Sequence, residues 1–413
     1  MTAPRSAVRY RIPGAVLTER EHSVPLDHAN PGGPKITVFT REVADPDGLD
    51  RPYLVFLQGG PGFEAARPTA APSGWQKRAL KDFRLLMLDQ RGTGRSTPVD
   101  DIPGDTPQAQ AEYLTHFRAD SIVRDAEIIR KDLGVDRWSV LGQSFGGFCA
   151  MTYLSIAPEG LREAFITGGL SPIGRPVDDV YRATFRTLVE RNEAFYATYP
   201  EDRGRVDDIL ARLEGEDVRL PSGDRLTGRR FLQLGFRLGA STGFEDMHHI
   251  LELPFGSRAF LYDIEAVVDF GRNPIYASIH EGCYADGGTT NWSSDRVMPD
   301  EVVERRYFTA EHIFRWMWED FGALASHAGA ADILAAHEWP RLYDADRLAR
   351  NEVPVAATIY VNDLYVDRAF AEETARQIRG LKPWITNEFE HDGLRAGGER
   401  VLDRLIDLAR GRA

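Results

Sequence analysis

Five short apolar segments restrict the fold of this chain more than any other feature of the sequence. Each is a nearly continuous run of aliphatic and aromatic residues, which is typical of a strand buried on both faces of a parallel sheet. Segments with apolar residues at helical spacing lie between some of them, for example at 121–134 and 146–160. Strands that alternate with helices predict a doubly wound α/β fold. The five runs cover 53–58, 84–90, 138–143, 163–169 and 355–361.

The region from 172 to 345 differs from the rest because it has few strand-like runs and is rich in charged and aromatic residues. Its pattern is mostly helical, as in 178–199 and 310–324. The simplest organisation is an α/β core, built on a mostly parallel sheet, that is interrupted by a large helical cap. The sequence therefore predicts a core formed by residues 1–171 and 346–413, with a cap domain at 172–345.

Composition and charge exclude several classes of protein. Of the 413 residues, 42% are hydrophobic and 27% are charged, which is an ordinary balance for a globular protein. The net charge of -13 argues against a nucleic-acid partner, because phosphate binding depends on clustered Lys and Arg. The two cysteines, Cys149 and Cys283, are far apart and form neither a disulfide framework nor a zinc-ligand pattern, so no metal is expected.

No segment of the sequence predicts an association with a membrane. No apolar run approaches the length that spans a bilayer, and residues 1–16 lack the continuous apolar stretch of a secretory signal. We therefore expect a soluble, cytoplasmic protein. The sequence leaves the oligomeric state open.

One serine stands between glycines directly after an apolar strand. Gly142-Gln143-Ser144-Phe145-Gly146 matches the G-x-S-x-G nucleophile elbow, in which a sharp strand-to-helix turn presents the serine hydroxyl above the ends of the strands. The alternative is a flexible turn whose serine caps the following helix. The apolar strand before the motif and the small residues after it favour Ser144 as a nucleophile.

A glycine-rich loop, FLQGGPGF at 56–63, follows an earlier strand. Backbone N–H groups at Gly59 or Gly60 are candidates for an oxyanion hole, together with the N–H of Phe145. Without the serine, an ordinary Gly-Pro turn would be the simpler interpretation. With Ser144 present, we predict that Gly60 and Phe145 stabilise the oxyanion.

A nucleophilic serine in this kind of fold is followed along the chain by an acid and then by a histidine. His391 is the histidine that lies at the end of the last strand-like run, so we predict that it is the base. Asp363 lies directly beyond the preceding strand, where its carboxylate can reach that histidine. Asp367 is the alternative acid, although it is also placed to cap a helix over 368–379.

Three motifs occur in an order and spacing that resemble a known family. They are Q-G-G-P-G at 58–62, D-Q-R-G-T-G-R-S at 89–96 and G-Q-S-F-G-G at 142–147. Together they resemble the proline iminopeptidase family, serine peptidases of the α/β-hydrolase fold, and the second motif is the most specific. The chain departs from the family pattern at Gln58, where a histidine is usual, and at Asp363, which stands in YVNDLYVD rather than in a G-R-Y-D sequence.

The resemblance also implies a set of binding residues. Members of the family recognise a free N-terminal amine through acidic residues of a helical cap. The stretch ASIHEGCYADG at 277–287 resembles the family's I-E-x-x-Y cap sequence, which implies that Glu281 and Tyr284 bind substrate. Glu311 is a second candidate for the amine. For both glutamates, the alternative is a solvated carboxylate on the face of a helix. The resemblance implies no metal and no organic cofactor.

The sequence therefore predicts a serine aminopeptidase that releases an N-terminal residue, preferentially proline, from short peptides or aminoacyl amides. Ser144 would form an acyl-enzyme, with His391 as general base and Asp363 orienting the imidazole. The alternative is an esterase or amidase that acts on small non-peptide acyl substrates, since one fold hosts many reactions. A binding module without activity is disfavoured by the complete set of serine, aspartate and histidine.

Overall fold

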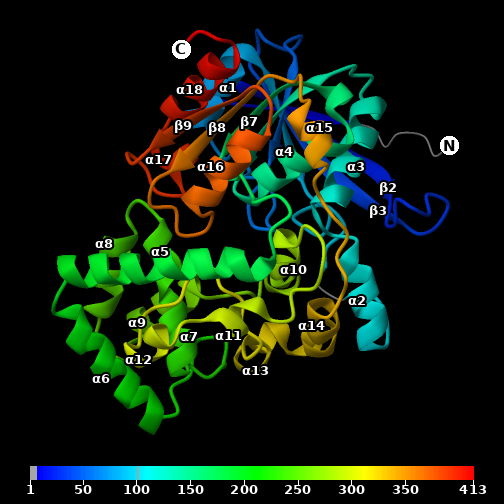
Figure 1. Cartoon of the computed structure of the whole chain (residues 1–413). Coiled ribbons are helices and arrows are strands. Elements are labelled where there is room, and N and C mark those ends of the chain that lie inside the picture. The colour runs from blue at the N-terminus through cyan, green and yellow to red at the C-terminus, as the bar shows by residue number, and fades with distance from the viewer. Residues whose placement is uncertain (1–6, 100–101) are drawn as a thin grey trace.

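The computed structural model describes residues 7–99 and 102–413. Its central element is a nine-stranded sheet in the order β1-β2-β3-β5-β4-β6-β7-β8-β9 (Figure 1). The pairs between β1, β2, β3 and β5 are antiparallel, and those from β5 across to β9 are parallel. The strands are β1 (Val8–Ile12), β2 (Ala15–Pro25), β3 (Lys35–Ala44), β4 (Tyr53–Leu57), β5 (Arg84–Asp89), β6 (Trp138–Gln143), β7 (Leu161–Thr167), β8 (Val355–Tyr360) and β9 (Leu381–Thr386).

Helices cover both faces of this sheet. One apolar cluster joins the sheet to α3 (Ala119–Asp132) and α4 (Phe145–Ile156), and a second joins it to α1 (Gly74–Asp82) and α18 (Arg400–Ala409). Strands β4, β6 and β8 are buried along their whole length, which explains why their sequences are continuous apolar runs. The predicted doubly wound, mostly parallel α/β fold is confirmed. α16 (Arg368–Gln377) packs against β8 and β9, and α17 (Gly393–Ala396) packs against α1 and α18. α2 (Pro107–Thr115) instead packs against helices of the segment between β7 and β8.

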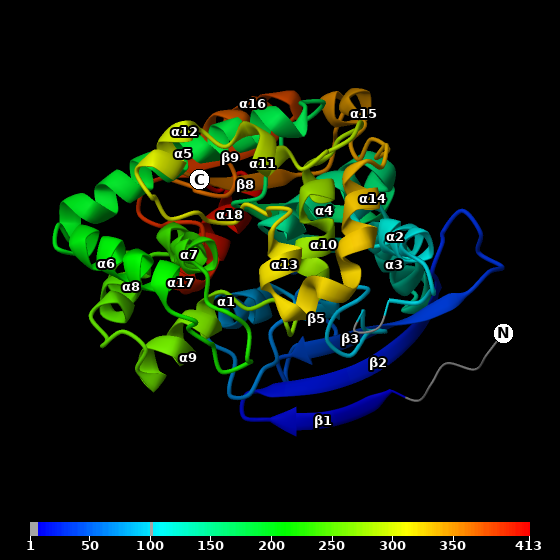
Figure 2. The same cartoon turned by 90° about the horizontal axis from the view of Figure 1, so that it is seen from below.

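The antiparallel strands form one edge of the sheet, which Figure 2 shows as a blue ribbon beside the helices. The long ladder between β2 and β3 runs from Val16 opposite Ala44 to Pro25 opposite Lys35. The edge strand β1 exposes nearly all of its side chains, so no apolar run marks it in the sequence.

The chain between β7 and β8 is mostly helical and forms the lower lobe in Figure 1. Its longest helix, α5, runs across the top of this lobe. One of the two apolar clusters includes residues of both the lobe and the sheet, so the two parts pack against each other. The α-helices of this stretch are α5 (Val177–Thr198), α6 (Asp202–Gly215), α7 (Gly228–Leu232), α8 (Gly243–Leu251), α9 (Arg258–Val267), α10 (Pro274–Tyr284), α11 (Ser293–Val297), α12 (Asp300–Glu304), α13 (Met317–Asp320), α14 (Ala328–Ala335) and α15 (Ala345–Ala349).

The helix predicted over 310–324 is wrong for most of its length, because only the short α13 forms an α-helix there. The backbone N–H groups before α13 find acceptors outside a helical ladder. The N–H of Phe314 donates to Met317 Sδ at 3.2 Å, and the N–H of Arg315 donates to Asp295 Oδ2 at 2.7 Å. The apolar periodicity of this segment therefore reflects burial of a loop rather than one face of a helix.

A buried arginine fixes the loop that follows β5. Arg91 donates to both carboxylate oxygens of Asp125, at 2.7 and 2.6 Å. The same guanidinium donates to the carbonyl oxygens of Leu26 and His116, at 2.8 and 2.7 Å. A bidentate ion pair with further carbonyl acceptors satisfies this buried cation, so the D-Q-R-G motif has a structural role in positioning the loop.

Two expectations concern membranes and export. Within the ranges that the structure describes, no helix combines the length and the apolar character that crossing a bilayer requires. The N-terminal segment considered for a secretory signal falls partly on residues 1–6, which lie outside the described residues.

The close packing of α4 beneath the strand ends leads to a stability prediction. A Cβ atom at Gly146 would collide with the backbone carbonyl of Leu57 at the end of β4. We expect Gly146→Ala to lower the free energy of unfolding by about 1–3 kcal/mol, the usual cost of overpacking. Denaturant-induced unfolding, followed by circular dichroism, measures this change.

Gly204 is the matched control, because it also lies in the first turn of a helix, α6, and a Cβ there meets open space. Gly204→Ala should leave the free energy of unfolding unchanged or raise it by about 0.5–1 kcal/mol. Equal losses of stability in the two variants would contradict the packing described for Gly146.

Candidate active site

Ser144 occupies a sharp turn between β6 and α4. Its backbone has φ 56° and ψ -126°, a conformation that non-glycine residues rarely adopt. The backbone N–H of Ser144 donates to the carbonyl of Thr167 in the neighbouring strand at 3.0 Å. Its side chain makes no capping hydrogen bond to α4, although it precedes the first helical residue. The interpretation of Ser144 as a helix cap therefore fails.

Glycines allow the backbone to approach itself around this turn. A Cβ at Gly142 would collide with the backbone of Gly146, and a Cβ at Gly59 would lie 2.9 Å from Ser144 Cβ. Only a residue without a side chain fits at these positions. Gly142 in the elbow and Gly59 in the loop after β4 are thus both required because the backbone around Ser144 packs too closely for a side chain.

The structure brings together Ser144, His391 and Asp363, as predicted from their order in the sequence. His391 Nε2 lies 2.8 Å from Ser144 Oγ, and His391 Nδ1 lies 2.9 and 2.8 Å from the two carboxylate oxygens of Asp363. The Asp363 carboxylate can only accept, so Nδ1 carries the proton and Nε2 is left to accept from the serine hydroxyl. This arrangement is what a serine nucleophile and its base require.

The loops after β8 and β9 position the acid and the histidine. Asp363 also accepts hydrogen bonds from the N–H groups of Tyr365 and Val366, at 2.9 and 3.0 Å, which fix its carboxylate. The backbone N–H of His391 donates to the carbonyl of Gly239 in the helical lobe at 3.1 Å. Burial alone would lower the pKa of His391, but the adjacent Asp363 carboxylate outweighs burial, so the pKa of His391 is raised.

Asp367, the alternative acid, has a different role. Its side chain accepts from the backbone N–H of Phe370 at 3.0 Å and caps the N-terminus of α16. No hydrogen bond or ion pair links it to His391 within the part of the chain that the structure describes. The geometry therefore favours Asp363 over Asp367 as the partner of the histidine.

A cavity of about 490 Å³ opens at Ser144 and His391. The predicted oxyanion residue Gly60 lines it, and the N–H of Phe145 belongs to the first turn of α4, whose N–H groups have no acceptor within the helix. The ring of Phe145 packs against Phe148 instead of lining the cavity, so it forms no wall for a substrate ring. The other lining residues include Gln58, Phe63, Glu64, Phe236, Arg237, Arg272, Tyr276, Glu311, Tyr365, Asp392 and Arg395.

Glu311 lies in this cavity, where the phenol of Tyr276 donates a hydrogen bond to its Oε1. Burial raises the pKa of Glu311 to about 7, and the Asp363 charge acts in the same direction. His391 and the Tyr276 hydroxyl oppose this shift. No Lys or Arg forms an ion pair with Glu311 among the described residues, so its charge is available to a cationic ligand.

The structure does not bring Glu281 and Tyr284 to the Ser144 cavity. The Glu281 carboxylate is buried and accepts from the N–H and Oγ of Ser294, at 2.9 and 3.2 Å, beside a separate small cavity. Tyr284 donates to the carbonyl of Tyr365 at 3.1 Å and packs against Phe148. Burial raises the pKa of Glu281, as it does for Glu311.

Sequence reasoning pointed to aromatic residues of the helical insertion in general, but it named none of those that line the cavity and none of its arginines. Tyr276 and Phe236 come from two different parts of the helical lobe, and no motif connects them with Ser144. Arg395 lies four residues after His391, and this short spacing was the one available signal.

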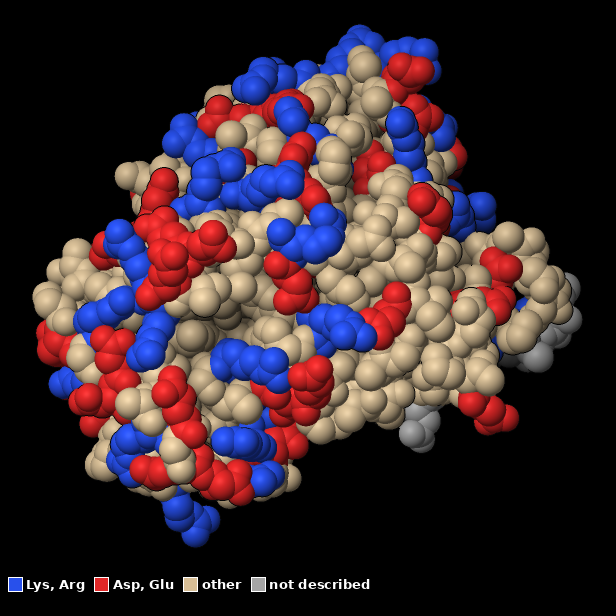
Figure 3. All heavy atoms as spheres, turned by 60° about the horizontal axis from the view of Figure 1, so that its bottom comes forward, with Lys and Arg blue, Asp and Glu red and all other residues tan. Residues whose placement is uncertain are grey.

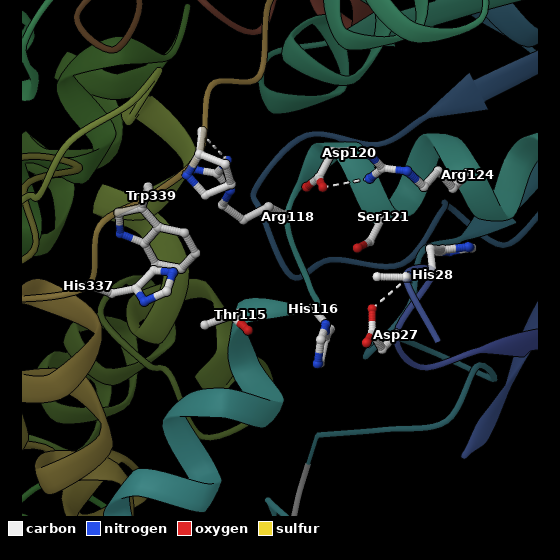
Figure 4. A pocket seen from close by; sticks show the side chains of 12 residues that line it. Asp27, His28, Thr115, His116, Arg118, Asp120, Ser121, Arg124, His337 and Trp339 are labelled. Carbon is white, nitrogen blue, oxygen red and sulfur yellow. Dashed lines mark hydrogen bonds and ion pairs between the residues drawn. The ribbon is translucent and has the colours of Figure 1, made fainter. Parts of the chain in front are cut away.

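A second cavity, of about 440 Å³, lies at the start of α3 and contains none of the predicted site residues (Figure 4). Its buried arginine, Arg118, donates to the carbonyl oxygens of Gly282, Ala285 and Pro340, at 3.0, 2.9 and 2.8 Å. These bonds attach α3 to the helical lobe. Arg124, drawn in the same view, is paired with Asp120 at 2.6 Å. Both arginines of this second cavity are thus hydrogen-bonded to other groups of the protein.

The sheet, the strained elbow and the histidine–aspartate pair define a hydrolase of the α/β-hydrolase class, and the model of the alpha/beta hydrolase fold family matches residues 52–212. A proline iminopeptidase of Aeromonas sobria is 46% identical to this chain, covering 98% of it and 99% of that protein. Proline iminopeptidase aneH of Aspergillus aculeatus is 35% identical, covering 96% of this chain and 94% of that protein. The chain belongs to the proline iminopeptidase family.

The two candidate acids lead to a test with isosteric variants. We expect Asp363→Asn to lower kcat by about 10⁴-fold, because the amide favours the wrong imidazole tautomer. Asp367→Asn should leave kcat within a factor of about two, since Asn caps a helix as well as Asp does. Steady-state hydrolysis of a prolyl 4-nitroanilide measures both. A large loss in the Asp367 variant with little loss in the Asp363 variant would reverse the assignment.

Proposed function

We propose that this protein is a serine aminopeptidase that releases an N-terminal residue, preferentially proline, from short peptides or aminoacyl amides. One observation carries the proposal: the cavity that contains Ser144 and His391 also contains Glu311, a carboxylate without a cationic protein partner in the described chain. Membership of the proline iminopeptidase family supports the same activity.

The reaction follows from the distances at Ser144. His391 Nε2 accepts the proton of the serine hydroxyl while Oγ attacks the carbonyl carbon of the N-terminal residue. The N–H groups of Gly60 and Phe145 hold the resulting oxyanion. The protonated imidazole, stabilised by Asp363, then gives its proton to the leaving nitrogen. Water deacylates Ser144 by the same route, with His391 again as base.

Glu311 supplies the selection for a free N-terminus. Burial makes its unpaired charge costly, which is why its pKa is raised. A substrate ammonium next to this carboxylate offsets that cost and restores the ionised form. A blocked N-terminus carries no such charge and leaves the carboxylate without a partner.

The aromatic wall of the cavity suits a pyrrolidine ring. Tyr276 lies at the centre of this wall, with ring centroids 5.4 Å from Phe63 and 6.2 Å from Phe236. The ring of Tyr365 lies 5.8 Å from that of Phe236 and 4.8 Å from the imidazole of His391. The methylene groups of a pyrrolidine ring bound here would pack against this wall, and the ring nitrogen, which is the N-terminal amine, would lie close to the carboxylate of Glu311.

We also propose that residues 172–345 act as the cap domain of this enzyme, over a core of residues 1–171 and 346–413. The support is that this stretch supplies Phe236, Tyr276 and Glu311 to a cavity whose nucleophile belongs to the core. The cytoplasmic location and the absence of a nucleic-acid partner stay predictions from the sequence.

The test compares prolyl 4-nitroanilide with its N-acetylated form. The wild type should favour the free substrate in kcat/KM by at least about 30-fold, the usual effect of losing one partner of a buried charge pair. Ser144→Ala should hydrolyse neither. Equal rates on the two substrates would reject the aminopeptidase and support the esterase or amidase alternative.

Glu311→Gln and Glu281→Gln form the matched pair for the amine site. We expect Glu311→Gln to lose the preference for the free substrate, mainly through KM, and Glu281→Gln to keep it. Labelling of Ser144 by a fluorophosphonate verifies that each variant is folded. Loss of the preference in Glu281→Gln alone would assign amine recognition to Glu281.

A further inference from the structure

Three arginines line the Ser144 cavity, and the reaction proposed above uses none of them. Arg272 is paired with Glu64 by a hydrogen bond of 3.0 Å, and Arg237 lies 4.0 Å from Asp246. For Arg395, no carboxylate lies within 4.0 Å of the guanidinium in the part of the chain described. Arg395 is therefore the cavity arginine most free to bind an anion.

Arg395 lines the same cavity as His391, the residue that protonates the leaving group in the proposed reaction. It belongs to the short helix α17, four residues after His391, and its positive charge tends to lower the pKa of that histidine. His391 must give its proton to the leaving nitrogen, so the leaving peptide lies next to the imidazole. Asp392, which follows His391 in the chain, accepts hydrogen bonds from the N–H and Oγ of Ser241, at 3.2 and 2.6 Å, and forms no ion pair with Arg395 among the described residues.

We propose that Arg395 binds the C-terminal carboxylate of a short peptide substrate, an inference that rests on the aminopeptidase function proposed above. In a dipeptide, the carboxylate carbon is two bonds from the leaving nitrogen, within reach of a long side chain beside His391. The guanidinium can hold both carboxylate oxygens at once. The cavity then binds a zwitterion, with Glu311 for the ammonium and Arg395 for the carboxylate.

Because the protein is negatively charged overall, a substrate carboxylate needs a positively charged side chain close to its binding site. The net charge is -13, and Figure 3 shows Lys and Arg interspersed with Asp and Glu over one face. Glu64, Glu311 and Asp392 also line the cavity and would repel a second carboxylate. Long-range attraction therefore does not favour peptides with a free carboxylate here, and a direct contact with Arg395 would have to supply the preference.

The experiment compares Pro-Leu with its C-terminal amide. The wild type should favour the free acid in kcat/KM by about tenfold or more, as expected for hydrogen bonds between charged groups. Arg395→Gln should bring this ratio to about one through a higher KM for Pro-Leu, while Arg395→Lys should keep part of the preference. Arg404→Gln is the matched control, because Arg404 is exposed on α18 outside the cavity, and its ratio should equal that of the wild type.

A wild-type ratio of one or less would overturn the proposal for Arg395, and so would a ratio that Arg395→Gln leaves unchanged. Prolyl 4-nitroanilide, which has no carboxylate, separates this failure from failure of the aminopeptidase function. Hydrolysis of the anilide and the peptide amide with a ratio of one rejects the carboxylate site alone. No hydrolysis of any of these substrates rejects both proposals.

Discussion

The backbone conformation of Ser144 is the constraint on which the rest of the site depends. A φ of 56° at a residue with a side chain persists only where the surrounding structure holds it. Here β6 leads into the turn, α4 leads out of it, and glycines on both sides allow the backbones to touch. The loop after β4, which carries Gly59 and Gly60, is held against the same turn. A side chain at Gly59 or Gly146 would therefore disturb the nucleophile as well as the packing.

The histidine and the acid are positioned from both parts of the molecule. Asp363 and His391 follow β8 and β9 of the sheet, yet the backbone of His391 is bonded to Gly239 in the helical lobe. The same lobe supplies Glu311 and Tyr276, which contact each other inside the cavity. Because core and lobe share one apolar cluster, Glu311 and Ser144 are held in a fixed relation. In the proposed reaction, this relation lets one cavity bind the N-terminal amine of a substrate and present the adjacent carbonyl to Ser144.

The sequence predicts the sheet and the sharp turn at Ser144 well, because both depend on local patterns. Buried parallel strands need continuous apolar runs, and a strained elbow needs glycines at fixed positions around Ser144. The exposed edge strand β1 has no apolar run, and the backbone bonds of the segment before α13 divert it from the helix that its periodicity predicts. These features depend on contacts with distant segments, which a local pattern does not record.

The substrate-binding residues show the same limit. A motif resemblance points to Glu281, while the cavity at Ser144 contains Glu311, and the choice between them depends on how the helical lobe packs. The spacing between His391 and Arg395 is visible in the sequence, but whether Arg395 can contact a substrate depends on where the leaving group lies in the folded cavity. The order of serine, acid and histidine is predictable because the sheet fixes it; the walls of the cavity are set by tertiary packing.

The most direct test of the central claim is the mass of the peptide that contains Ser144 after rapid acid quenching. The enzyme is mixed with an activated prolyl ester or with its N-acetylated form, and the quenched protein is digested and analysed by mass spectrometry. An acyl-enzyme mechanism that selects a free amine predicts a gain of one prolyl group on Ser144 from the ester with a free amine, and none in Ser144→Ala. Absence of this acyl group, or equal acylation by the N-acetylated ester, would contradict it.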